Sequence, residues 1–301
     1  MLIKPREIPA ELAILRILNA RMNLTEKEKL HYYILEKGYE GEVKFDSLTK
    51  NLQNEHLITN DLLLDYNYST FQIDSLIHFQ KSLYLIDVKN FEGDYIFKSD
   101  GFYSAADKPI KDPLAQLKRC ELLLSQLNHQ YGYNLTIESY LVFINPEFTL
   151  YHAPENQQII LPTQVNRFIK KLNTIPSKLT DKHIKLAKHL VSLHQRDNPF
   201  TRLPSYNYDQ LKKSLTCVTC NSFSLHVGRS KFTCNICSCV EEVESAVIRC
   251  VGELRLLFSD KKITTRFVYE WCGGILSEKL IRRVLNENFT ITSKYRFAHF
   301  K

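Results

Sequence analysis

The stretch from Phe71 to Lys89, FQIDSLIHFQKSLYLIDVK, constrains the fold of this chain more than any other segment. Two runs rich in β-branched and aromatic residues flank Gln80-Lys81, a pattern that predicts a β-hairpin. If the loop holds two or four residues, Phe79 lies opposite Ser82, and the numbers of facing residues add up to 161. The sequence therefore predicts not only two strands but also their register.

This register gathers charged side chains on one face of the hairpin. It places Asp74 opposite Asp87, with the side chains roughly 4.5–5.5 Å apart. Lys89 shares the face because side chains alternate along a strand. Facing carboxylates repel each other unless a cation lies between them, so a divalent metal with a lysine beside it is the economical explanation.

Both faces of the predicted hairpin are otherwise apolar, which indicates that it is buried. The face of the carboxylates also carries Leu76, Leu83 and Leu85. The opposite face is expected to carry Ile73, Ile77, Phe79, Tyr84, Ile86 and Val88. Carboxylates at the end of a buried hairpin are costly unless they are used, which favours a functional site over an exposed edge hairpin.

The length of 301 residues predicts one large domain or two to three modest ones. The first residues, MLIKPREIPAELAIL, lack the pattern of a signal peptide, and apolar runs stay short of the ~20 residues that span a bilayer. Four of the eight cysteines form two C-x-x-C pairs. We therefore expect metal-bound thiolates in a reducing cytoplasm rather than disulfides.

The net charge of +7 is concentrated in one region, since residues 163–213 contain 11 Lys and Arg against three Asp. A basic segment of this kind indicates a phosphate backbone as partner. A solvated helix face is the alternative explanation.

Residues 1–175 are expected to form helix, several antiparallel strands, a further helix and a further strand, which predicts an α/β or α+β domain. A capping box of Thr25 with Glu28 opens a helix that we expect Gly38 to end, and a second helix from Glu40 carries Glu42 in its first turn. Asp112-Pro113 begins a later helix that extends to about Gln130. Strands are expected near residues 57–64, 71–79, 83–89, 94–98 and 139–144.

Three shorter segments follow this domain. Residues 176–215 read as a basic helical connector and linker, 216–240 as a zinc ribbon, and 241–301 as a helix-turn-helix or winged-helix-like module. The zinc ligands predicted by the two C-x-x-C pairs are Cys217, Cys220, Cys234 and Cys237. Cys239 or His226 could replace one of them, whereas Cys120, Cys250 and Cys272 lie in apolar helical patterns typical of packed core thiols.

The last module has a helix, glycine turn, helix outline around Gly273-Gly274. Lys279, Arg282 and Arg283 share one face of its second helix, a face able to meet DNA. The segment Phe289–Phe300, with a turn at Ser293-Lys294, alternates as a wing would. A protein-binding or purely structural helical cap would show the same pattern.

Four motifs in order resemble the nuclease-related domain of bacterial proteins: GYEGE (38–42), QID (72–74), DVKNFEG (87–93) and DPLAQ (112–116). That family looks like a branch of the restriction-endonuclease-like superfamily with its D…(D/E)-x-K motif. The resemblance covers residues 10–150 and implies a central mixed sheet flanked by helices. The sequence departs from the family in Asp87, where Glu is more usual, and in Asp112, where Asn is more usual.

The resemblance also implies roles for individual residues. Asp74 and Asp87 would bind Mg²⁺ (or Mn²⁺) with support from Glu42, Lys89 would orient or deprotonate the attacking water, and Gln116 would contact the site or the phosphate. Metal carboxylates beside a lysine are what phosphodiester hydrolysis requires. We therefore expect a Mg²⁺-dependent endonuclease acting on DNA, with RNA as the alternative substrate. A non-catalytic nucleic-acid-binding protein that keeps the nuclease fold is the second hypothesis, and a scaffold whose zinc module binds protein is the third.

Overall fold

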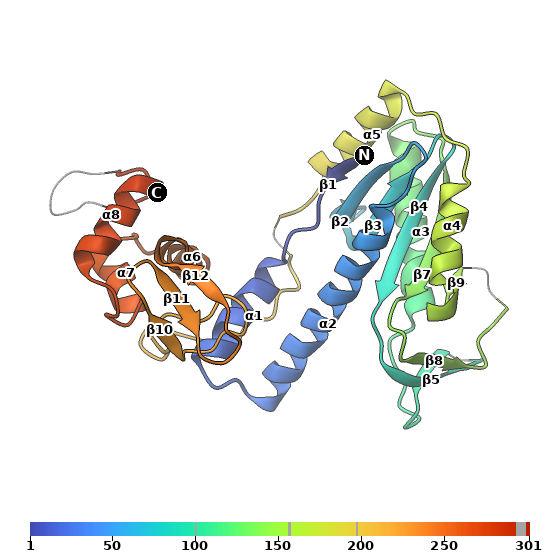
Figure 1. The fold of residues 1–301 in the computed structure, drawn as a ribbon. Coiled ribbons are helices and arrows are strands. Elements are labelled where there is room, and N and C mark those ends of the chain that lie inside the picture. Colours follow the sequence, from blue (N-terminus) through green and yellow to red (C-terminus); the bar gives the residue numbers. More distant parts are fainter. Residues whose placement is uncertain (100, 156–157, 197, 293–298) are drawn as a thin grey trace. The chain divides into compact units, whose positions relative to one another are not determined.

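The computed structural model describes residues 1–99, 101–155, 158–196, 198–292 and 299–301 (Figure 1). It divides into two compact units. The first comprises Met1–Ile8 and Ile34–Phe200, and the second comprises Pro9–Tyr33 and Thr201–Lys301. Helix α2 (Glu26–Thr49) begins in the second unit and ends in the first.

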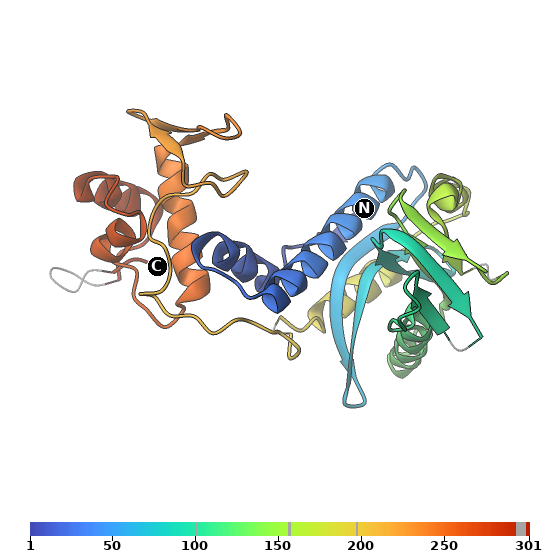
Figure 2. The ribbon, with the colours of Figure 1, turned by 90° about the horizontal axis from the view of Figure 1, so that it is seen from below.

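The first unit is built on a mixed six-stranded sheet of order β1-β2-β3-β4-β7-β9. Neighbours β2–β3 and β3–β4 are antiparallel, while β1–β2, β4–β7 and β7–β9 are parallel. Figure 2 shows the same ribbon from below, with β2 and β3 as a long light-blue hairpin. Its strands are β1 (Leu2–Lys4), β2 (Leu57–Tyr66), β3 (Ser69–His78), β4 (Ser82–Lys89), β7 (Thr136–Phe143) and β9 (Ile159–Ile160). A smaller sheet consists of β5 (Gly93–Lys98), β6 (Gly101–Ser104) and β8 (Phe148–Tyr151).

Helices cover both faces of the large sheet. Helices α3 (Pro113–Gln130) and α5 (Asp181–Ser192) pack on one face through leucines of both helices. Helix α2 and helix α4 (Val165–Asn173), which follows a 3₁₀ turn (Pro162–Gln164), pack on the other face. This arrangement confirms the predicted mixed α/β core, and α5 adds part of the expected connector to it.

The predicted hairpin register is confirmed, but one side chain of the hairpin was assigned to the wrong face. Ser75 pairs with Ile86 and His78 with Leu83, so facing numbers add up to 161. Ile73, expected on the face of Ile77, instead joins the core that contains Leu76, Leu83 and Leu85. The cause lies in the neighbouring strand β2, where Asp61, opposite Asp74, has a left-handed backbone with φ 51°. Beyond Asp61 the alternation of side chains is reversed, so Leu62 and its partner Ile73 both face the core that contains Leu76.

The predicted helix end at Gly38 was wrong. Helix α2 continues through Gly38 and Gly41 to Thr49, so Glu42 lies in the middle of the helix rather than in a first turn. A glycine inside a helix costs only about 1 kcal/mol, which tertiary packing readily offsets. At Gly41 the packing needs that glycine, because an added Cβ would lie 2.6 Å from Cβ of Asn90 and 3.2 Å from Ile144.

The two glycines are expected to respond in opposite ways to alanine. Gly38→Ala should raise the free energy of unfolding by up to about 1 kcal/mol, since its Cβ would meet nothing within 4 Å. Gly41→Ala should lower it by about 1–3 kcal/mol, because the new Cβ overlaps Asn90. Urea unfolding of the two variants measures both changes, and equal effects would contradict the close approach of α2 to the end of β4.

The second unit combines the first helix of the chain with the C-terminal third. Its elements are α1 (Ala10–Arg21), β10 (Leu225–Val227), β11 (Lys231–Cys234), β12 (Val240–Glu242), α6 (Val243–Leu257), α7 (Thr265–Trp271) and α8 (Glu278–Asn288). Arg21, which is 2% exposed, links α1 to the C-terminal part of this unit. Its guanidinium donates hydrogen bonds to the carbonyl oxygens of Lys212 and Ser214 and to the carboxylate of Glu253. Residues 9–33, grouped with the nuclease-like segment from sequence, therefore pack with the C-terminal helices.

Short backbone contacts follow the last C-terminal helix, and the predicted winged-helix-like module stays a prediction. Ser277 caps α8 after a turn that contains Gly273 and Gly274, both with positive φ. Backbone hydrogen bonds join Thr290 to Lys301 and Thr292 to His299, and Ile263 bridges Phe300. The predicted Ser293-Lys294 turn lies outside the described residues. Within the described ranges, helices that are long and apolar enough to cross a bilayer are absent.

Candidate functional site

The end of β4 brings Asp74, Asp87 and Lys89 together. Oδ2 of Asp74 accepts a hydrogen bond of 2.8 Å from the backbone N–H of Val88, so the carboxylate of β3 reaches across to β4. Nζ of Lys89 lies 2.6 Å from Oδ1 of Asp87, and the two side chains are 18% and 9% exposed. The three residues whose proximity the sequence predicted thus share one partly buried cluster.

Burial and neighbouring charges shift the pKa values of the ionisable groups in this cluster. Burial raises the pKa of Asp87 to about 7; the Lys89 ammonium opposes that rise and Asp74 adds to it. Burial opposes the charge of Lys89, but the carboxylates of Asp87 and Asp74 outweigh it and raise the pKa of Lys89. Burial, and next the Asp74 carboxylate, raise the pKa of Glu42 well above its ordinary value. A bound cation would relieve these carboxylates.

Glu42 joins the cluster through Arg6, a residue that sequence reasoning missed. Nη1 of Arg6 donates to Oε2 of Glu42 at 2.5 Å, and Nη2 donates to the backbone carbonyl oxygen of Asp74 at 2.6 Å. Nε and Nη2 of Arg6 also bind the two carboxylate oxygens of Asp46, at 2.9 and 3.1 Å. Asp46 follows Glu42 by one helical turn and could have been found from that spacing, whereas no local pattern points to Arg6.

Gln116 lies in the first turns of α3 and is half-buried. Its backbone N–H donates to the carbonyl oxygen of Asp112, and the predicted role of its side chain stays a prediction. Cys120, one turn further along α3, donates to the carbonyl oxygen of Gln72. Burial, with smaller contributions from Asp87 and Asp74, raises the pKa of Cys120 to about 11, which indicates that this side of α3 approaches the carboxylates.

The carboxylates fit a Mg²⁺ ion that keeps several of its waters. Oδ1 of Asp87 is buried and, although Lys89 is close, no donor in the described ranges is aligned for a hydrogen bond to it. Mg²⁺ commonly binds proteins through one or two carboxylates plus substrate phosphates. Asp74 and Asp87 are the residues that could hold it, since Glu42 is already bound to Arg6.

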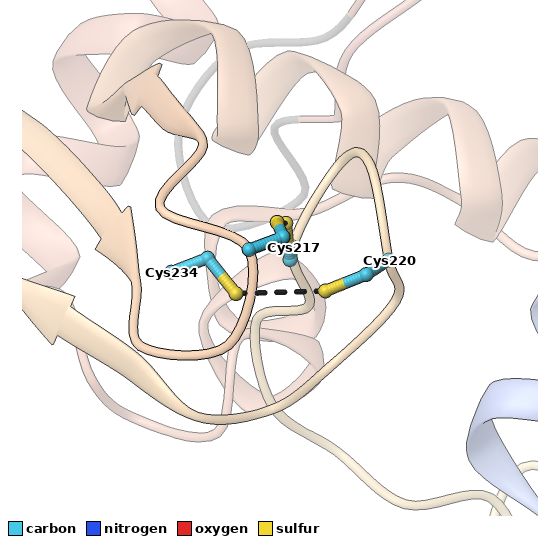
Figure 3. A group of neighbouring side chains, drawn as sticks. Cys217, Cys220 and Cys234 are labelled. Atoms are coloured by element: carbon cyan, nitrogen blue, oxygen red, sulfur yellow. Dashed lines mark hydrogen bonds between the residues drawn. The ribbon is translucent and has the colours of Figure 1, made fainter.

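The four predicted cysteines form a separate cluster in the second unit. Sγ atoms of Cys217, Cys220, Cys234 and Cys237 all lie within 4.8 Å of one another, and Figure 3 shows three of the residues. The pairs Cys217–Cys237 and Cys220–Cys234 have sulfur atoms 3.5 Å apart, close to the roughly 3.8 Å that a tetrahedron with Zn–S bonds of ~2.3 Å requires. The cluster is consistent with a zinc site.

The surroundings of the cysteine cluster support the predicted ligand set. Backbone N–H groups of Thr219 and Ile236 donate to Cys217 and Cys234, as in zinc knuckles. Cys239 and His226 are not in the group. Cys120, Cys250 and Cys272 are buried free thiols, as expected.

The basic residues of α8 are exposed. Lys279, Arg282 and Arg283 all lie on its solvent side, while Ile281 and Val284 face the core. Of these three, Arg283 has an ion-pair partner, Glu287, at 4.0 Å. This exposed face is available to a partner. That the partner is DNA stays a prediction.

Residues 37–144 match the family model of the nuclease-related domain, NERD. The matched range includes Glu42, Asp74, Asp87, Lys89 and Gln116, and ends before the cysteine cluster. The chain therefore carries a NERD nuclease-related domain, as its motifs predicted. Comparisons with curated proteins and with solved structures found no match.

Proposed function

We propose that this protein is a metal-dependent endonuclease that hydrolyses DNA phosphodiester bonds, with a C-terminal zinc-containing region that binds DNA. The observation that carries the proposal is the contact of Lys89 with Asp87 beside Asp74, inside a nuclease-related domain. Eight free cysteines suit a reducing cytoplasm.

Each residue of the cluster has a chemical task in this proposal. Mg²⁺ held by Asp74 and Asp87 would supply a Lewis acid for a non-bridging phosphate oxygen. The neighbouring carboxylates stabilise the ammonium form of Lys89, which favours a cationic role: orienting the attacking water and offsetting the charge that develops on the phosphate. Gln116 would contact the phosphate from α3.

Incubation of the purified full chain with supercoiled plasmid tests the proposal. We expect nicked and then linear DNA with Mg²⁺ or Mn²⁺ and none with EDTA. A labelled RNA of the same sequence, incubated in parallel, decides between the two substrates. Tight binding to both nucleic acids without cleavage would instead support a non-catalytic nucleic-acid-binding protein.

A structural Zn²⁺ on the four cysteines and a phosphate-binding face on α8 complete the proposed C-terminal region. If Lys279, Arg282 and Arg283 each contact a phosphate, the log–log dependence of DNA affinity on salt should become shallower by about 0.9 for each residue replaced by alanine. Zinc content should stay unchanged, because these residues lie on α8 and not in the cysteine cluster.

A charge-matched control separates specific contacts from net charge. Its substitutions fall on exposed lysines of the same unit: Lys27, Lys29 and Lys262. Fluorescence anisotropy at several salt concentrations should give the wild-type slope for this control. An unchanged slope for the α8 variant would indicate that α8 does not meet DNA, and a protein partner would then be the better explanation.

A further inference from the structure

Arg6 is the cation most deeply enclosed by the acidic cluster. Its side chain is 3% exposed, and four hydrogen bonds join it to Glu42, to both oxygens of Asp46 and to the carbonyl oxygen of Asp74. A buried guanidinium is costly unless its N–H groups are used, and here they are directed at the carboxylates of α2 and the backbone of β3. Arg6 therefore holds α2 against the strand that carries Asp74.

The charge balance of the cluster is suited to one divalent cation. Eight charged side chains lie here without being exposed: the carboxylates are Glu42, Asp46, Asp61, Asp74 and Asp87, and the basic groups are Lys4, Arg6 and Lys89. Fully ionised, these five acids and three bases carry a net charge of −2. One Mg²⁺ neutralises that charge, and a second would leave an excess of two positive charges in a partly buried site.

The positions of the cations lead to the same result. In two-metal nucleases the ions lie ~3.5–4 Å apart and share carboxylates. Here Arg6 binds Oε2 of Glu42 and the backbone carbonyl oxygen of Asp74, whereas the carboxylate of Asp74 reaches β4, where Asp87 contacts Lys89. Among the described residues, Oδ1 of Asp87 is a buried oxygen without a hydrogen-bond donor, so we expect a metal ion at the Asp74–Asp87 pair.

We infer that Arg6 is a fixed internal cation that takes the place of a second metal ion, so that the centre binds a single divalent cation at Asp74 and Asp87. Glu42 then serves to hold Arg6 and is not a metal ligand. The inference rests on the proposed metal-dependent function, and it makes Arg6 a positioning residue, since it acts through Glu42 and the backbone of Asp74.

Binding of Mn²⁺ to the zinc-loaded full chain, without DNA, tests this inference. Calorimetry and the paramagnetic resonance signal of free Mn²⁺ should give about one ion per chain for the wild type. Arg6→Gln removes the charge and frees Glu42, and should raise the stoichiometry to about two. Arg6→Lys keeps the charge and should bind about one. Lys4→Gln, a control that removes a nearby charge bound to Asp61, should also bind about one.

Further variants keep the test decisive if Arg6→Gln does not fold. Arg6→Gln combined with Glu42→Gln leaves no unpaired charge between these two positions, and should fold and bind about one Mn²⁺. Two ions on the wild type, or one ion with unchanged affinity on a folded Arg6→Gln protein, would overturn the inference. One ion on a wild type that cleaves no nucleic acid would instead remove the proposed function and leave the role of Arg6 intact.

Discussion

Lys89→Ala is expected to slow metal-dependent cleavage by at least about 10²–10³-fold, the effect typical of removing one electrostatic group from a preorganised site. Nζ of Lys89 lies 2.6 Å from Oδ1 of Asp87. Its loss therefore removes the positive charge beside the carboxylates of Asp74 and Asp87. The pKa of Asp87, already raised to about 7 by burial, should then rise further and weaken Mg²⁺ binding. Plasmid cleavage under single-turnover conditions measures the rate.

The same hairpin provides a matched control. Lys81 lies exposed in the turn between β3 and β4, far along the strand from Asp87, so Lys81→Ala should cleave at the wild-type rate. Circular dichroism should show both variants folded. A Lys89→Ala protein that cuts as fast as the Lys81→Ala protein would show that Lys89 takes no part in the chemistry.

Loss of the zinc site is expected to have the second large effect. Structural zinc contributes about 10–16 kcal/mol in small zinc modules, more than the stability of most domains. Cys234→Ser removes a buried ligand at the end of β11, so the ribbon of β10, β11 and β12 should unfold and become sensitive to proteases. Elemental analysis should fall from about one zinc per chain to about zero.

Cys239→Ser is the control for this loss, because Cys239 lies two residues from Cys237 but outside the cluster. It should keep about one zinc and resist proteolysis like the wild type. Full zinc content in the Cys234→Ser protein would mean that another residue, such as His226, can complete the site.

Strand patterns could be predicted from the sequence because their determinants are local. The alternation of residues 71–89 and the short loop at Gln80-Lys81 determine the register, and with it the approach of Asp74 to Asp87. The two C-x-x-C spacings likewise determine which cysteines converge. The family motifs, confirmed by the match to the nuclease-related domain, placed these elements in order.

Features that depend on distant parts of the chain could not be predicted in this way. Gly38 was expected to end a helix, but α2 continues through it, and Gly41 lets α2 approach Asn90, a contact that no local pattern reveals. Arg6 is 36 residues from Glu42 and 68 from Asp74, so its place in the cluster comes only from tertiary structure. The left-handed backbone of Asp61 reverses which side chains near Ile73 face the core. This conformation is seen only in the folded chain.

The most direct measurement of the central claim is the cleavage rate of supercoiled plasmid across a Mg²⁺ titration, for the wild type and for Asp74→Asn purified in parallel. Asp74→Asn removes one of the two carboxylates proposed to hold the metal but leaves an oxygen that can accept from the N–H of Val88, so the fold should be kept. We expect a rate that rises with Mg²⁺ and saturates for the wild type, and no cleavage by Asp74→Asn. Cleavage by the wild type in EDTA, or equal rates for the two proteins, would contradict a metal-dependent nuclease at this site.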